Sequence, residues 1–133
     1  MKAAVTRDVA LDIVTTQPPP HAVAMWWLGQ ASVVLRVAGT TVYIDPFFSE
    51  YPDRLALPPF APETAAPADY VPCTHEHVDH FDPQTLPGLA QASPRARFVV
   101  PLHMVEQATA LARSGHYVLQ QGASELIAVT DCR

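Results

Sequence analysis

The stretch that decides the fold is THEHVDH, residues 74–80. It places three histidines, one aspartate and one glutamate in seven positions, in a chain of 133 residues with six histidines in total. His75 and His77 are two residues apart, so in an extended segment their side chains leave the same face and can close on one metal ion. Asp79 and His80 follow where the chain turns, within reach of a second ion. The spacing H-x-H-x-D-H therefore predicts a two-metal site.

The donor types narrow the choice of metal. Imidazole and carboxylate together suit zinc, manganese or iron and argue against calcium or magnesium, with zinc as the first candidate. Two other zinc patterns fail by one position: H-E-x-x-H would need histidine at 79, and the deaminase H-x-E would need glutamate at 77. The alternative is a solvated, histidine-rich turn. We expect Glu76, which lies between ligands, to point into solvent or to a partner behind them.

Apolar runs on both sides of the motif predict an α/β (α+β) fold. Three short runs rich in β-branched and aromatic residues predict three consecutive antiparallel strands: AVAMWWL (22–28), SVVLRVA (32–38) and TTVYID (40–45). YVPCT (70–74) resembles a short buried strand that carries the histidines at its carboxyl end. Further along, the sequence predicts a helix starting near Asp82, strands at 96–102 and 125–130, and a helix at 103–115. A mixed sheet with helices packed on it follows.

The chain divides into two parts. Residues 1–21 end in QPPPH and are expected to form an extended arm, because no helix or central strand tolerates that run of prolines. Residues 22–133 are about one domain long, or part of a domain. The stretch 45–70 contains six of the fourteen prolines and is either a loop beside the site or a solvated crossover.

Composition argues against several classes of partner. The formal net charge is −5 and the arginines are scattered, so no basic stripe favours nucleic acid. No apolar run approaches the ~20 residues that span a bilayer, and charged residues interrupt any signal peptide. Only two cysteines are present, Cys73 and Cys132, which do not make a disulfide framework. We expect a cytoplasmic protein in which Cys73 is a core residue, the alternative being a thiolate ligand to metal.

The chain resembles the metallo-β-lactamase superfamily, whose mark is H-x-H-x-D-H. The resemblance extends over about residues 25–130. WLGQASVVLRVAGTTVYIDP (27–46), THEHVDHFDPQTL (74–86) and ARFVVPLH (96–103) occur in the order found in the branch that includes L-ascorbate-6-phosphate lactonase. The resemblance implies an αββα sandwich with a metal site at one edge of its two sheets.

The resemblance also implies roles for individual residues. His75 and His77 would hold the first metal, and Asp79 and His80 the second. Asp45, in YIDP, matches the family aspartate that supports the ligands from behind; alternatively it is a plain turn residue before a proline. The implied reaction is attack of a metal-activated hydroxide on a sugar lactone or another ester, with Asp79 orienting the hydroxide and relaying its proton. A phosphodiesterase or phospholipase of the same superfamily is the neighbouring possibility.

The predicted ligand set is short. A catalytic zinc has about three protein ligands, so two metals need more than four. In the family the missing members come from the second half of the sandwich, so we expect this chain to be the N-terminal half. His103 could substitute, or it could be a histidine at a helix start without a metal role. The alternative to an enzyme is a non-catalytic half-domain that acts through a partner.

An unpaired half-sandwich would leave one sheet face uncovered. Met25, Trp27, Val33 and Leu35 would lie on that face, and an apolar surface of this kind marks an interface. We therefore expect a homo-oligomer or association with a C-terminal half. The small-molecule substrate would be an ester or lactone, with or without a phosphate group, and the residues that bind it cannot be assigned from the sequence.

Overall fold

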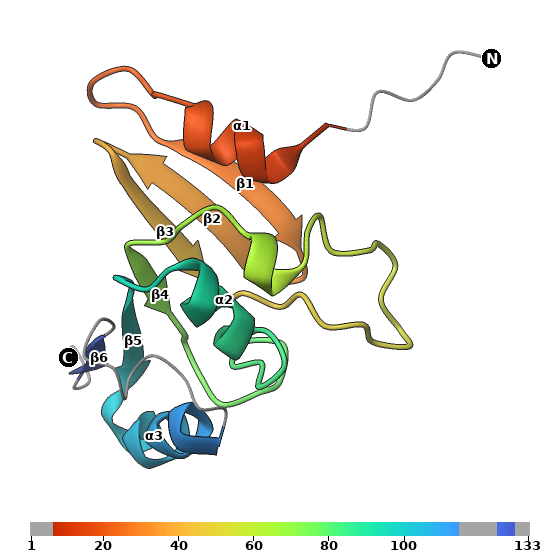
Figure 1. Cartoon of the computed structure of the whole chain (residues 1–133), viewed down its shortest axis with the longest axis vertical. Helices are drawn as coiled ribbons and strands as arrows, with labels where there is room; N and C mark the ends of the chain where they lie inside the picture. Colours follow the sequence, from red (N-terminus) through yellow and green to blue (C-terminus); the bar gives the residue numbers. More distant parts are fainter. Residues whose placement is uncertain (1–6, 115–124, 130–133) are drawn as a thin grey trace.

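The computed structural model describes residues 7–114 and 125–129. Its strands form one six-stranded sheet in the order β1-β2-β3-β4-β5-β6 (Figure 1). The strands are β1 Ala24–Gly29, β2 Ser32–Val37, β3 Thr40–Ile44, β4 Tyr70–Pro72, β5 Arg97–Pro101 and β6 Glu125–Val129. The helices are α1 Val9–Thr15, α2 Leu86–Ala92 and α3 Val105–Ser114, with 3₁₀ turns η1 Pro62–Thr64 and η2 Leu102–Met104.

The sheet is mixed, as the sequence predicted. β1, β2 and β3 form an antiparallel meander, and β4, β5 and β6 run parallel to β3. The join between the two halves depends on Asp69. Its carboxylate accepts from the Thr41 amide at 2.7 Å, and its carbonyl accepts from the Arg97 amide at 2.9 Å. One residue thus bridges the strands on both sides of the short β4.

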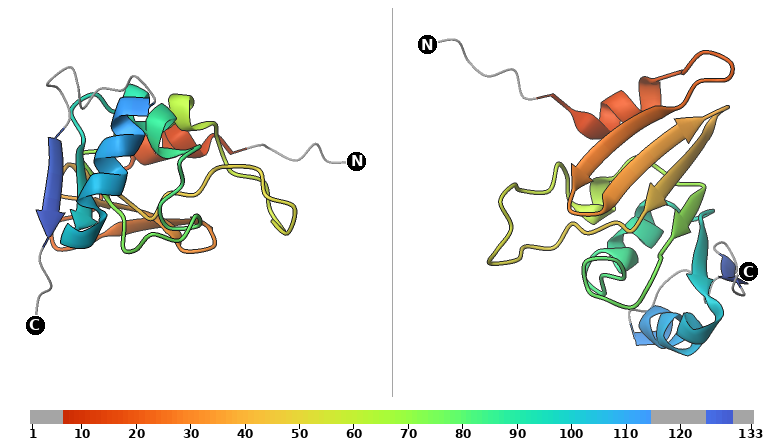
Figure 2. Two further views of the ribbon diagram at one scale, coloured as in Figure 1. Left: turned by 90° about the horizontal axis from the view of Figure 1, so that it is seen from below. Right: turned by 180° about the vertical axis from the view of Figure 1, so that it is seen from behind.

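Helices cover one face of the sheet (Figure 2). Strand residues alternate between that face and the other, as the period of two requires. The buried set includes Val34, Tyr43, Val71 and Val100, which form one core with residues of all three helices. This agrees with half of an αββα sandwich.

The opposite face of the meander is apolar and exposed, and Trp27 stands at its end, beside the β1–β2 turn. Met25 is 66% exposed and Trp27 is 72% exposed. In the register, Met25 pairs with Leu35, and Trp27 pairs with Val33. The four residues that the sequence placed on an uncovered face are therefore neighbours on it.

The expected extended arm at 1–21 is wrong for its middle section, which is helix α1. Asp8 caps the amino end of α1 with its carboxylate, and Ile13 is fully buried against the sheet. Asp12 accepts a hydrogen bond from the Trp26 indole of β1 at 2.7 Å. The prolines after the helix do lie outside regular structure. A helix of seven residues shows only a weak periodicity of apolar residues along the sequence. The proline run that follows it therefore led to the prediction of an extended arm.

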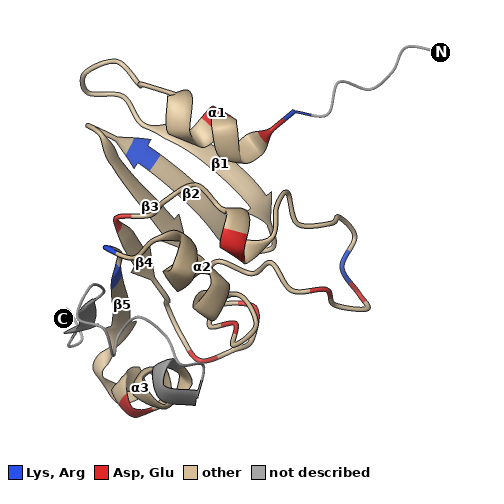
Figure 3. Ribbon diagram, in the orientation of Figure 1, with Lys and Arg blue, Asp and Glu red and all other residues tan. Residues whose placement is uncertain are grey.

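Among the described residues, no helix is long and apolar enough to cross a membrane. The described basic side chains are spread over the segment before α1, β2, the long loop and the region of β5 rather than aligned along one surface (Figure 3).

Candidate metal centre at the carboxyl edge of the sheet

The predicted site residues follow two neighbouring parallel strands, and His103, the possible substitute, follows a third. β3, β4 and β5 end at the same edge of the sheet, where α/β proteins place their functional groups. β3 is followed by Asp45, β4 by Thr74 and the histidine motif, and β5 by His103. The topology therefore brings together residues that are far apart in the sequence.

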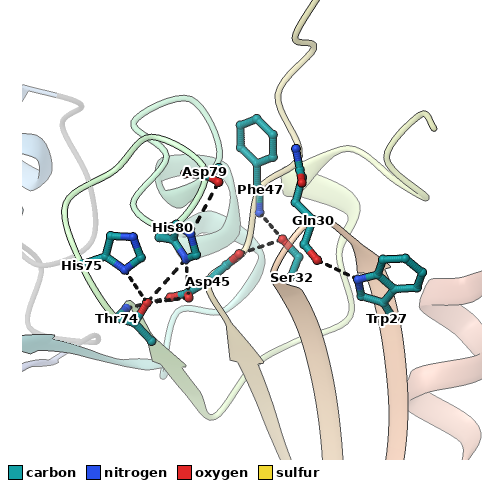
Figure 4. Close-up of polar contacts among 9 residues, drawn as sticks. All are labelled: Trp27, Gln30, Ser32, Asp45, Phe47, Thr74, His75, Asp79 and His80. Atoms are coloured by element: carbon teal, nitrogen blue, oxygen red, sulfur yellow. Dashed lines mark hydrogen bonds and ion pairs between the residues drawn. The ribbon is translucent and has the colours of Figure 1, made fainter. Parts of the chain in front are cut away.

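Asp45 is the buried anchor of this edge. The residue is only 3% exposed. The carboxylate accepts from the Thr74 amide, from the Thr74 hydroxyl and from His80 Nδ1, each at 2.7 Å (Figure 4). Its φ is +46°, a left-handed conformation that aspartate adopts more readily than most residues. Asp45 therefore contacts a predicted ligand. Its role in supporting the ligands stays a prediction.

This contact orients the ring of His80. A carboxylate only accepts, so Nδ1 donates to Asp45, and Nε2 is turned to the opposite side of the ring. Nε2 lies 3.4 Å from an oxygen of Asp79. The two residues predicted to share the second ion are therefore in contact, with Nε2 of His80 facing the carboxylate of Asp79.

The three histidine rings form one cluster. The ring centroids of His75 and His80 are 3.8 Å apart, and those of His75 and His77 are 4.7 Å apart. The expected extended segment is wrong: residues 75–80 form bends and a turn, in which the His80 amide donates to the His77 carbonyl at 2.9 Å. A tight turn, rather than strand alternation, brings the rings together.

The fit to a metal can be tested on these positions. In chemistry the donor set suits zinc, manganese or iron. In geometry the donor side chains lie near one another but do not yet surround a common point. Within residues 7–114 and 125–129, no three His, Cys, Asp or Glu side chains already form a metal-binding group. Rotation of the histidine rings within the cluster would be needed to direct the donors at common points.

Glu76 and His103 contact each other rather than the cluster. Glu76 Oε2 lies 3.3 Å from His103 Nε2, and both side chains are exposed. A hydrogen bond from its own backbone, and then the contact with His103, lower the pKa of Glu76. Glu76 thus has the partner expected of a residue between ligands. His103 reaches the correct edge but is directed at Glu76.

Cys73 is a core residue, as expected. Burial and then the nearby Asp45 charge raise the pKa of its thiol to about 12. Its side chain packs in the main hydrophobic core.

Sequence reasoning missed two residues that contact Asp45 in the candidate site. Thr74 donates twice to Asp45, and its hydroxyl lies 3.0 Å from His75 Nδ1. Ser32 donates to the Asp45 carbonyl at 2.7 Å and accepts from the Phe47 amide at 2.8 Å. The position of Thr74 directly before the motif was a usable signal, because a buried carboxylate needs several donors. Ser32 carries no such signal.

The fold and the site together define a class of protein: a mixed sheet, helices on one face, and a His-Asp cluster at the carboxyl edge of its parallel strands. Residues 24–130 match the family model described as "Beta-lactamase superfamily domain". The chain belongs to this superfamily.

Individual relatives extend the comparison. The chain is similar to an isothiocyanate hydrolase from Delia radicum gut bacteria, with 25% identity, a TM-score of 0.52 and coverage of 80% of this chain and 41% of that one. It shares the fold of CmlA, a diiron β-hydroxylase from Streptomyces venezuelae, with 24% identity, a TM-score of 0.54 and coverage of 88% and 22%. It is 27% identical over 84 residues to N-acyl-phosphatidylethanolamine-hydrolyzing phospholipase D 1 of Caenorhabditis elegans.

The last match covers 57% of this chain and 24% of the phospholipase, so the chain spans about a quarter of that relative. The superfamily predicted from the motif is confirmed. Placement on the lactonase branch stays a prediction.

Proposed function

We propose that the protein is the metal-binding part of a hydrolase that cleaves an ester or lactone. Two divalent ions, zinc first and manganese or iron as alternatives, would be held by His75 and His77 and by Asp79 and His80. The observation that carries the proposal is the chain of contacts from buried Asp45 through His80 to Asp79. Ions bound there would supply Lewis-acid activation of water and of the carbonyl oxygen.

The protein residues have separate tasks. Asp45 and Thr74 keep His80 in the orientation that presents Nε2. Asp79, which is partly exposed, orients the attacking water and accepts its proton. His75 and His77 present imidazoles from the start of the turn. The cluster has too few donors for two complete ion shells, so further ligands would come from another segment or a partner chain.

The substrate class is proposed at two levels. A sugar lactone, with or without a phosphate group, is the first choice, on the motif order described above. A phosphodiester is the second, favoured by the similarity to a phospholipase D. Initial rates on a lactone and on bis(4-nitrophenyl) phosphate, with Zn²⁺, Mn²⁺ or Fe²⁺ added in turn, separate the two.

The test of metal binding is the metal content of the purified chain. We expect the double variant His75→Ala, His77→Ala to retain much less metal than the wild type. The control is His21→Asn, because His21 lies outside the cluster and asparagine tolerates its φ of +66°. Equal metal in the double variant and the wild type would refute the assignment.

A further inference from the structure

A pocket of about 310 Å³ opens at the same edge of the sheet, away from the histidines. It lies between the β1–β2 turn and the long loop after β3. Trp27 and Gly29 form one wall, and Leu55 and Ala56 form the other. Nothing in the proposed chemistry uses this pocket.

Arg54 connects the loop that forms the second wall to the end of β1. Its guanidinium donates to the Ala56 carbonyl at 2.6 Å and the Phe47 carbonyl at 2.8 Å, and more weakly to the Leu28 carbonyl at 3.4 Å. It also lies over the Phe47 ring, 5.1 Å from the centroid. These contacts join the loop to the end of β1, beside the pocket.

The Trp27 indole is also fixed. Its Nε1 donates to the Gln30 carbonyl at 2.8 Å, so the ring stands as a flat apolar wall (Figure 4). The tryptophan and Leu55 are exposed despite their size. Covering such apolar surface with a ligand is favourable.

The lining suits a neutral apolar group. Asp53 and Arg54 both line the pocket, so their formal charges cancel. The volume lies at the lower end of the ~300–1,000 Å³ range of small-molecule sites. A phenyl-sized ring or a short alkyl group is therefore the matching occupant, rather than a long lipid chain.

The pocket and the histidine cluster are linked along the edge. β1 ends at the pocket and β4 ends at the cluster, three strand spacings of ~4.8 Å away, or about 14 Å. Between them Ser32 bonds to both Phe47 and Asp45. A single extended molecule can reach both places.

We propose that this pocket binds a neutral aryl or short alkyl group at the far end of the substrate, while the bond to be cleaved lies at the histidine cluster. This assignment of substrate class rests on the proposed hydrolase function. Binding at the pocket, in contrast, needs no metal and no turnover.

The first experiment measures binding to the full chain in the presence of a chelator. Trp26→Phe leaves Trp27 as the sole tryptophan, and its fluorescence is titrated with 2-phenylethanol. We expect saturable quenching that weakens about tenfold or more in Leu55→Asp, because a charge replaces an apolar wall. Leu57→Asp is the matched control, an exposed leucine of the same loop outside the pocket. If Trp26→Phe does not fold, the fluorescence of Trp27→Phe is subtracted from that of the wild type, and the difference reports on Trp27.

The second experiment measures KM for acetate esters of ω-phenyl alcohols with linkers of increasing length. We expect KM to fall once the linker spans about 14 Å, and Leu55→Asp to abolish this fall. Absence of saturable quenching, or equal weakening in Leu55→Asp and Leu57→Asp, overturns the pocket. Quenching as expected with no ester hydrolysis supports the pocket while the hydrolase proposal fails. Hydrolysis that ignores linker length overturns the assigned substrate class and leaves the hydrolase proposal standing.

Discussion

At the residue scale, Asp45 and Thr74 contact two of the three clustered histidines, His80 and His75. The motif itself identified the four candidate ligands, because their spacing is visible along the chain. The supporting network was only partly visible. Asp45 could be placed by resemblance, whereas Ser32 and Thr74 join it through contacts that exist only after three strand ends have met.

Replacing Thr74 with valine keeps the shape of the side chain but removes its hydroxyl. Asp45 then loses one of its donors, and His75 loses its contact with the hydroxyl. We expect zinc affinity to fall roughly 10–100-fold, as for other residues that hold ligands in place. Calorimetric titration with Zn²⁺ measures this. Thr64→Val, at an exposed threonine away from the site, should leave the affinity unchanged; an equal affinity in both variants would contradict the role of Thr74.

Tyr43 should make the protein sensitive to alkali. The ring is buried, its hydroxyl donates to the Ala66 carbonyl at 2.8 Å, and burial raises its pKa. The unfolded tyrosine ionises near pH ~10, so the stability that Tyr43 supplies is complete below that pH and is lost as pH rises above it. Tyr43→Phe should therefore be less stable than wild type at neutral pH, by ~0.5–1.5 kcal/mol, with the gap narrowing above pH ~10.

Urea unfolding at several pH values provides that comparison. Tyr51→Phe is the control, because Tyr51 is exposed. A gap between wild type and Tyr43→Phe that stays constant up to pH ~11 would contradict the prediction.

At the scale of elements, the strands were predictable and the first helix was not. Runs of β-branched and aromatic residues identify strands locally. Helix α1 is short, and its stability comes from contacts with the sheet, through Ile13 and the Asp12–Trp26 hydrogen bond. These contacts join residues that are distant in the sequence, so local patterns do not reveal them.

Truncating Ile13 measures how much α1 contributes. Ile13→Ala should lower the free energy of unfolding by ~2–5 kcal/mol, because a fully buried side chain leaves a cavity. Val14→Ala, on the exposed side of the same helix, should change it by less than ~0.5 kcal/mol. Chemical denaturation compares the two; similar losses would mean that α1 does not pack as described.

At the scale of the whole molecule, the superfamily and the half-sandwich followed from the motif and the order of strands. The pocket beside Trp27 did not, because it needs Arg54 to reach the carbonyl of Leu28, 26 positions away. The exposed apolar face of the meander was expected, since strand alternation fixes both faces at once. We propose that this face, around Met25 and Leu35 and short of the Trp27 ring that lines the pocket, binds a second copy of the chain or the remainder of a larger domain.

Sedimentation velocity tests this association. We expect the wild type to sediment faster as its concentration rises. Met25→Lys places a charge on the exposed face and should leave a monomer. Leu102→Lys, at an exposed leucine beyond β5, should associate like the wild type. A wild type that stays monomeric at all concentrations would rule out a second copy as the partner.

The order of the strands has a consequence for folding kinetics. Each strand lies beside its neighbour in the chain, so the sheet can grow from one edge by adding the next segment. The meander closes short loops, whereas pairing β4 with β3 must first close the long loop between Ile44 and Tyr70. We therefore expect the transition state to contain the meander without β4. The histidines then meet Asp45 only when that loop closes, so the edge that carries the histidine cluster and the parallel half of the sheet form in the same late step.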